Sequence, residues 1–260
     1  MEYEYILFSI ENKVGKITLN RPKSFNSFVL PMAKEVQAAL DICAENPEIR
    51  AVYLTGAGKA FCAGEDLNEA IDPNGPGMKR IVEETYKPII TRLRALPKPV
   101  VGAVNGIAAG AGANIALACD LCVAAESAAF LQAFSKIGLI PDSGGTFFLP
   151  RLIGIQKAAA LMMLGEKVSA KEAVAMNMIY KTFTDESFAS ESLALAETLA
   201  NMPTKALAYT KQLLNISAEN DLGTQLLAER DYQVMSGQTA DYGEGVQAFL
   251  EKRKPVFKGE

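Results

Sequence analysis

A single carboxylate stands in a loop of glycine and apolar residues in the middle of the chain. Asp142 follows Leu-Ile-Pro and precedes Ser-Gly-Gly-Thr, and the next residues are Phe-Phe-Leu-Pro. Apolar neighbours raise the pKa of a carboxyl group above its ordinary value of about 3.9, which makes the carboxylate a stronger base and the carboxyl a matched acid for returning the proton. Asp142 is therefore a candidate general base and acid, and Pro-Asp-Ser-Gly is also typical of a helix N-cap.

Two segments rich in small residues could present backbone N–H groups to a ligand. They are KAFCAGEDL at residues 59–67 and NGIAAGAGANIALACD at residues 105–120. Glycine allows close approach of the backbone, and a helix N-terminus adds partial positive charge. If the two turns meet, one N–H from each can hold an oxygen atom that becomes negative during a reaction, as in an oxyanion hole. Tight packing alone is the competing interpretation.

The residue types present exclude several other kinds of site. Gly110-Ala-Gly112 lacks the third glycine of a dinucleotide fingerprint, and no Gly-Lys-Ser/Thr of a Walker A loop follows. The sequence contains no histidine, which removes Ser-His and Cys-His nucleophilic sites and the commonest metal ligand. Cys119-Asp-Leu-Cys122 has no second cysteine pair to complete a zinc site, so we expect two packed cysteines and no metal.

Length and composition favour one hydrophobic core with an appended element. The chain has 260 residues, with 26 Lys and Arg against 30 Asp and Glu, and no long basic block, so we expect no nucleic-acid partner. Four irregularly spaced cysteines and the absence of a signal-peptide pattern indicate the cytoplasm. Residues 99–118 carry no charge, but their Ala and Gly content and two asparagines predict a buried core segment instead of a membrane span.

Hydrophobic periodicity predicts an α/β chain. Strand patterns cover residues 5–10, 16–20, 51–55, 100–104 and 121–125, and helical patterns cover residues 30–43 and a stretch that ends near Cys119. Further helical patterns cover residues 155–164, 186–200, 204–216, 221–236 and 240–253, with a capping box at Ser169-Ala-Lys-Glu172. We therefore expect an α/β core at residues 1–195 and a helical element at residues 196–260 that covers the core or another subunit.

Four ordered motifs carry a resemblance to a known family. They are AFCAGEDL at residues 60–67, PKPVVGAVNGIAA and the glycines after it at residues 97–112, IGLIPDSGG at residues 137–145 and DYGEGVQAFL at residues 241–250. Together they resemble the crotonase, or enoyl-CoA hydratase/isomerase, superfamily over essentially the full chain. The resemblance implies a crotonase-like stacked ββα core, a C-terminal helical trimerisation element, and a homotrimer or a dimer of trimers (homohexamer).

The resemblance also implies roles for individual positions. The two oxyanion-hole N–H groups of the family fall on Glu65 and Ala111, and the active aspartate of dienoyl-CoA isomerases falls on Asp142. The positions implied to bind CoA are Lys23, Ser24, Phe25, Ala63, Gly64, Asp66, Leu67 and Gly110. The side chains of Glu65 and Asp66 are also typical of a solvated turn. No cofactor is implied, because CoA is part of the acyl-CoA substrate.

The sequence departs from the hydratase pattern at both catalytic glutamates. The matching positions hold Asn114 and Phe134, and neither side chain is a carboxylate. Adding water to a double bond requires one group to activate the water and another to handle the proton on the α-carbon, whereas a 1,3 proton shift needs only one acid/base group. Dehalogenases of 4-chlorobenzoyl-CoA keep their nucleophile at the position of Asp142, but they also use a histidine and a tryptophan, and this sequence has neither.

We therefore predict an acyl-CoA isomerase that works through a thioester enolate, with Asp142 as base and acid. Within the family, the resemblance is greatest to the isomerases of phenylacetate catabolism, which implies ring-1,2-epoxyphenylacetyl-CoA as substrate and a 3-enoyl-CoA to 2-enoyl-CoA shift, as in fatty acid metabolism, as a related activity. Two alternatives are an enoyl-CoA hydratase with Glu65 as second carboxylate and a non-catalytic acyl-CoA-binding scaffold. The width of the acyl pocket depends on residues 71–86, which the sequence does not place.

Overall fold

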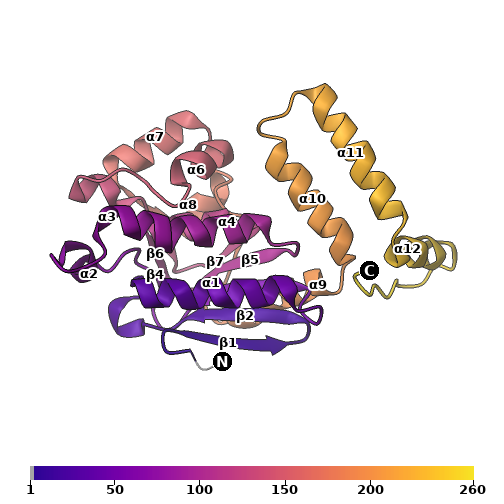
Figure 1. Cartoon of the computed structure of the whole chain (residues 1–260), viewed down its shortest axis with the longest axis horizontal. Coiled ribbons are helices and arrows are strands. Elements are labelled where there is room, and N and C mark those ends of the chain that lie inside the picture. Colours follow the sequence, from indigo (N-terminus) through magenta and orange to yellow (C-terminus); the bar gives the residue numbers. More distant parts are fainter. Residues whose placement is uncertain (1–2) are drawn as a thin grey trace.

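Two adjoining sheets form the centre of the protein. A computed structural model describes residues 3–260 (Figure 1). The six-stranded sheet has the order β1-β2-β3-β5-β7-β10, and only the β1–β2 pair is antiparallel. Its strands are β1 (Ile6–Glu11), β2 (Val14–Leu19), β3 (Ala51–Gly56), β5 (Val100–Val104), β7 (Leu121–Ala125) and β10 (Lys181–Phe183). The four-stranded sheet contains β4 (Ala60–Cys62), β6 (Ile107–Ala109), β8 (Ala129–Leu131) and β9 (Lys167–Ser169).

The chain passes between the two sheets three times in succession. Strands β3, β5 and β7 are neighbours in the larger sheet, and each is followed by a short strand, β4, β6 or β8, in the smaller one. The predicted wound α/β core is therefore present, with each turn stacked on the one before it. The sequence did not reveal the short strands, because three small or apolar residues carry no readable periodicity.

Helices cover the sheets and extend beyond them. Around the core lie α1 (Leu30–Glu45), α2 (Leu67–Ile71), α3 (Gly77–Arg80), α4 (Lys87–Ala95), α5 (Ala111–Ala118), α6 (Gly145–Ile153), α7 (Ile155–Leu164), α8 (Ala170–Ala175) and α9 (Phe188–Ala200), with short helical segments η1 (Pro22–Ser24), η2 (Ile81–Tyr86) and η3 (Ala133–Ile137). Helices α10 (Thr204–Ile216), α11 (Leu222–Gly237) and α12 (Ala240–Leu250) project to one side (Figure 1). Helix α12 ends at Leu250, three residues before the predicted end at residue 253.

The uncharged segment at residues 99–118 is the centre of the core. It forms β5, β6 and α5, and every residue of β5 and α5 is buried. Small side chains let α5 lie directly against both sheets, which is why the segment is rich in Ala and Gly. Within residues 3–260, no helix has both the length and the hydrophobicity needed to cross a membrane.

Helix α9 crosses the predicted domain boundary at residue 195. Its Ala196 and Ala200 are fully buried and belong to the main hydrophobic core. Helix α10 is tied to the core by a buried ion pair, in which Lys211 Nζ lies 2.8 Å from Asp120 Oδ2. The division into a core and a C-terminal helical element stays a prediction, with α9 shared across the boundary.

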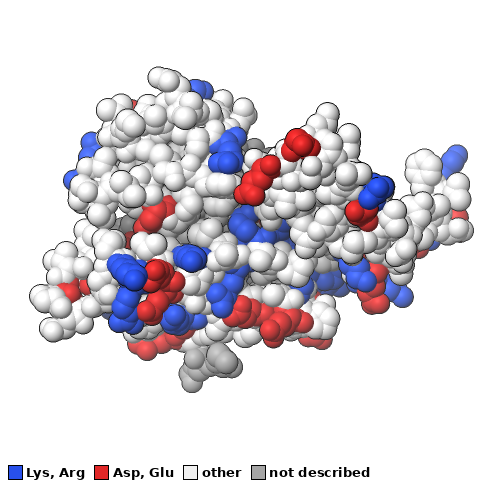
Figure 2. Space-filling view, turned by 45° about the horizontal axis from the view of Figure 1, so that its top comes forward, with Lys and Arg blue, Asp and Glu red and all other residues white. Residues whose placement is uncertain are grey.

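Basic and acidic side chains are mixed on the surface that Figure 2 shows. No large patch of one sign covers that face, in keeping with the formal net charge of −4. Such a surface does not favour binding to a polyanion.

Candidate active site

The two predicted turns lie side by side. Strand β4 pairs in parallel with β6, with Cys62 opposite Ala108, so the turn after each strand emerges at the same edge of the sheet. A Cβ atom on Gly64 would lie 3.4 Å from the Ala111 nitrogen. One on Gly112 would lie 2.4 Å from the Cys62 carbonyl oxygen. The glycines in both motifs therefore permit direct contact between the first turn and the start of α5.

The N–H groups of Glu65 and Ala111 are both without a protein acceptor within residues 3–260. Glu65 forms a parallel bridge with Phe28, in which the Phe28 N–H donates to Gly64 and the Phe28 carbonyl accepts from Asp66. That pattern directs the N–H of Glu65 away from Phe28. Ala111 is the first residue of α5, where no preceding turn can accept its N–H. Two donors from adjoining turns are thus available to one oxygen atom.

Asp142 lies in the loop before α6, and its side chain does not cap that helix. The N-cap residue is Gly144, and Ser143 and Gly144 both have left-handed φ angles of 50° and 75°. The predicted N-cap role of Asp142 is therefore wrong, because the chain makes a further turn before the helix begins. The carboxylate accepts a 2.9 Å hydrogen bond from the Ser143 hydroxyl instead.

An amide of α5 holds the backbone of this loop in place. Asn114 Nδ2 donates to the carbonyl oxygen of Asp142 at 2.9 Å, and Asn114 Oδ1 accepts from Gln132 Nε2 at 2.8 Å. Asn114 is fully buried, and Gly145 packs so closely on it that a Cβ there would lie 2.4 Å from Asn114 Nδ2. Since Asn114 is one turn after Ala111, this contact places Asp142 beside the N-terminal end of α5.

Burial raises the pKa of Asp142 to about 6, and the hydrogen bond from Ser143 opposes that effect. Desolvation disfavours the charged form of a carboxyl group, which makes the carboxylate more basic. The group is therefore ionised at neutral pH and yet close enough to neutrality to take up and return a proton. This agrees with the expectation drawn from its apolar neighbours in the sequence.

A second carboxyl group, that of Glu65, lies in the same site. Its Oε2 accepts a 2.5 Å hydrogen bond from the hydroxyl of Tyr86, and its Oε1 is buried without a partner. Burial raises the pKa of Glu65 to about 7; the Tyr86 hydrogen bond lowers it, and the negative charges of Glu69 and Asp142 raise it further. Neither Glu65 nor Asp66 is a freely solvated turn residue, because Asp66 pairs with Arg21 at 3.0 Å.

Sequence reasoning did not identify two residues of this site, Tyr86 and Gln132. Tyr86 ends the π-helical turn η2, in the segment that the sequence could not place, and it is 1% exposed. Gln132 follows β8 and is buried. A lone tyrosine or glutamine in an apolar stretch gives no signal of its partner, since both contacts depend on the tertiary structure.

The predicted CoA-binding residues lie on two neighbouring segments. The Phe25 carbonyl accepts from the Ala63 N–H at 3.0 Å, which joins residues 23–25 to the turn that contains Gly64. Lys23 is exposed and Phe25 and Leu67 are about half exposed, whereas Gly64 and Gly110 are buried. Asp66 caps α2 through the Asn68 N–H and pairs with Arg21, which gives its side chain a structural part. CoA binding by these residues stays a prediction.

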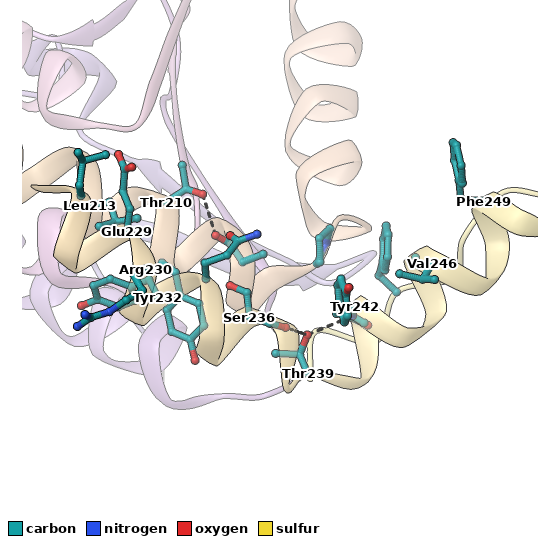
Figure 3. Close-up of a pocket in the computed structure, with 18 of the residues that line it drawn as sticks. Thr210, Leu213, Glu229, Arg230, Tyr232, Ser236, Thr239, Tyr242, Val246 and Phe249 are labelled. Atoms are coloured by element: carbon teal, nitrogen blue, oxygen red, sulfur yellow. Dashed lines mark hydrogen bonds between the residues drawn. The ribbon is translucent and has the colours of Figure 1, made fainter.

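Phe134, at a position matched to a hydratase glutamate, is buried in η3, and its Cζ would lie 3.8 Å from a Cβ on Gly110, so the ring borders the start of α5. A hollow of about 950 Å³ lies among α10, α11 and α12, lined by Leu213, Tyr232, Val246 and Phe249 among others (Figure 3). It contains none of the predicted site residues. Within the described chain, no group of three acidic, cysteine or histidine side chains is placed to hold a metal ion.

The chain is similar to known proteins over nearly its full length. The family described as Enoyl-CoA hydratase/isomerase matches residues 9–260. The chain is 48% identical over 260 residues to the 1,2-epoxyphenylacetyl-CoA isomerase of Escherichia coli, covering 99% of each protein. It is 34% identical to a trans-2-decenoyl-[acyl-carrier-protein] isomerase of Streptococcus mutans, covering both in full.

Solved structures show the same fold. The enoyl-CoA hydratase of Bacillus anthracis superimposes with a TM-score of 0.92 at 36% identity. The superposition covers 99% of this chain and all of that one. The fold predicted from the sequence motifs, a crotonase-like α/β core with C-terminal helices, is therefore confirmed. The chain belongs to the enoyl-CoA hydratase/isomerase family.

Proposed function

We propose that this protein is an acyl-CoA isomerase that moves a proton along the acyl chain through a thioester enolate. Asp142 is the base and the acid, and the N–H groups of Glu65 and Ala111 hold the thioester oxygen. The observation that carries this proposal is the placement of a carboxylate with a raised pKa beside two N–H groups that have no other acceptor. The reaction needs no metal or redox cofactor, because the proton and its electrons stay within the substrate and Asp142.

The proposed reaction has two steps. The Asp142 carboxylate takes a proton from C2, and the electron pair of that C–H bond passes into an enolate whose negative oxygen accepts from the two N–H groups. The protonated Asp142 then returns the proton to C4, and the double bond moves from C3–C4 to C2–C3. The number of atoms is unchanged, and no water is consumed.

The preferred substrate is proposed to be ring-1,2-epoxyphenylacetyl-CoA, with 3-enoyl-CoA as a related one. In its seven-membered oxepin form, the epoxide substrate carries a double bond at C3 relative to the thioester, so both substrates require the same proton shift. The similarity to the Escherichia coli isomerase supports the choice of the epoxide.

The test measures isomerisation of 3-hexenoyl-CoA and of ring-epoxidised phenylacetyl-CoA by the wild type and by Asp142→Asn. We expect the variant to lose about 100- to 10,000-fold in kcat, the usual worth of a general acid/base, while still binding acyl-CoA. Asp41→Asn, on the exposed face of α1, is the matched control and should keep full activity. Full activity in Asp142→Asn would refute the proposal.

An enoyl-CoA hydratase is the second candidate, because Glu65 places another carboxyl group in the site. Water addition to crotonyl-CoA that survives Asp142→Asn would favour it. Binding of acyl-CoA with no turnover of any thioester would instead favour a non-catalytic scaffold.

A further inference from the structure

The side chain of Glu65 has an arrangement that the proposed proton shift does not use. Tyr86 is 1% exposed and donates its hydroxyl to Glu65 Oε2, while Glu65 Oε1 is buried and receives no hydrogen bond from residues 3–260. The π-helical turn η2 ends at Tyr86. π-helical turns are rare in proteins, and those that occur are often found at functional sites. Here the turn places Tyr86 so that its hydroxyl donates to the carboxyl group of Glu65.

An ionised Glu65 would be poorly accommodated in this position. The titratable groups that face it are Tyr86 of η2, Glu69 of α2, Cys62 of β4 and Asp142 of the loop before α6, and all four are acids. A buried carboxylate oxygen without a donor loses its hydration and gains nothing in return. A protonated Glu65 can instead share its proton with the nearby carboxylate of Glu69, a hydrogen bond that also raises the pKa of Glu65. The surroundings therefore favour the neutral acid.

The same residue also contributes a backbone N–H to the proposed oxyanion hole. A negative side chain on Glu65 would repel the enolate oxygen held by its own N–H and would also repel the charge of Asp142. A neutral carboxyl carries no charge and avoids both repulsions. Two nearby carboxyl groups that share one proton in this way titrate as a pair.

We propose that Glu65 is a neutral acid in the active enzyme, which combines an ionised Asp142 with a protonated Glu65 held by the Tyr86 hydroxyl. This inference depends on the proposed isomerase function. It defines a narrow range of active pH: activity rises as Asp142 loses its proton and falls as Glu65 loses its own. Above the pKa of Glu65, the activity decreases about tenfold for each pH unit.

The experiment records kcat/KM for 3-hexenoyl-CoA between about pH 5 and about pH 9 in the wild type, Glu65→Gln, Glu65→Leu and Tyr86→Phe. Glutamine keeps the shape and a donor but cannot ionise. Glu65→Gln should retain activity within about threefold near pH 6 and lose the decline above about pH 7. Glu65→Leu also cannot ionise, so it should lose the same decline, with a lower activity at every pH because the buried Tyr86 hydroxyl loses its acceptor.

Tyr86→Phe provides an independent test, because the Tyr86 hydrogen bond lowers the pKa of Glu65. Its removal should move the decline to higher pH. A folded Glu65→Gln that is inactive at every pH, or that declines as the wild type does, would refute the role of Glu65. If Glu65→Gln does not fold, Tyr86→Phe decides the question: a decline in activity at the same pH as in the wild type would refute the role of Glu65. If one of these refuting results is found while Asp142→Asn is inactive in the same assay, only the inference about Glu65 fails. If Asp142→Asn is fully active, the proposed isomerase function fails as well.

Discussion

At the scale of single residues, the site depends on an amide where the hydratase pattern has a carboxylate. Asn114 donates to the Asp142 carbonyl and accepts from Gln132. An ionised glutamate or aspartate at this position could only accept, so it could not hold the same loop. The change from carboxylate to amide therefore does more than remove a base, because it also positions the remaining one.

Asn114→Asp should separate these effects. The variant keeps the shape but loses the donor to Asp142, so we expect kcat to fall about 10- to 100-fold with little change in KM, as for a displaced catalytic group. Steady-state kinetics with 3-hexenoyl-CoA measures both constants. Asn12→Asp, exposed in the turn between β1 and β2, is the control. Unchanged kcat in Asn114→Asp would show that the amide does not position Asp142.

The raised pKa of Asp142 also predicts an effect on stability. Its folded-state pKa of about 6 lies above its ordinary value of 3.8, so ionisation costs more in the folded protein. Stability from this group is fully present below the unfolded pKa and is lost as the pH rises to about 6. Asp142→Asn should therefore raise the free energy of unfolding near pH 7 by about 1–3 kcal/mol and have little effect near pH 4. Urea unfolding at both pH values measures the difference, and a destabilised variant near pH 7 would contradict it.

At the scale of elements, the contact between α5 and β4 sets the distance between the two N–H groups. Gly112 permits that contact, since a Cβ there would lie 2.4 Å from the Cys62 carbonyl oxygen, and backbone atoms cannot yield as a flexible side chain can. The substitution should therefore force α5 and the turn at Gly64 apart.

We expect Gly112→Ala to destabilise the protein by about 1–3 kcal/mol and to lower kcat/KM by at least about tenfold. Gly243→Ala is the matched control: Gly243 lies in α12 with nothing within 4 Å of the added Cβ, so alanine should raise stability by up to about 1 kcal/mol. Thermal unfolding and kinetics of both variants provide the comparison. Wild-type kinetics in a stable Gly112→Ala would contradict the role of the contact.

At the scale of the whole molecule, the C-terminal helices leave large apolar side chains uncovered. Leu226 and Phe249 are 54% and 83% exposed and line the hollow among α10, α11 and α12 (Figure 3). A monomer rarely leaves such a surface exposed, because association would bury it. This supports self-association of the chain, and the homotrimer or dimer of trimers stays a prediction.

Leu226→Glu combined with Phe249→Glu should lower the assembly to single chains of 27.9 kDa. Burying two charges in an apolar interface is unfavourable. Sedimentation equilibrium measures the mass. Leu7→Glu, on the edge strand β1 and 55% exposed in the monomer, should leave the assembly intact. A wild type that sediments as a monomer would refute the predicted assembly.

Much of the architecture could be predicted because its signals are local. Hydrophobic periodicity gave the bounds of β5, β7, α7 and α10 to the residue, and Ser169 and Glu172 form the predicted capping box. The turn between β1 and β2 is a two-residue hairpin loop formed by Asn12 and Lys13, both with positive φ. It is shorter than expected, because the predicted strands ended at residue 10 and began again at residue 16. Such backbone angles depend on how the two strands pair.

The sequence alone determined which groups were available for chemistry: Asp142 in an apolar loop, two small-residue turns, no histidine, and an amide and a phenyl group in place of two glutamates. Only the tertiary structure decided that the two turns meet, that Asn114 holds Asp142, and that Tyr86 donates to Glu65. The physical reason is the separation along the chain over which each kind of signal acts. Residue type and periodicity act over a few neighbours, whereas the contacts of the site join residues from 18 positions apart, as Asn114 and Gln132, to 50 apart, as Cys62 and Gly112, and depend on how sheets and helices pack.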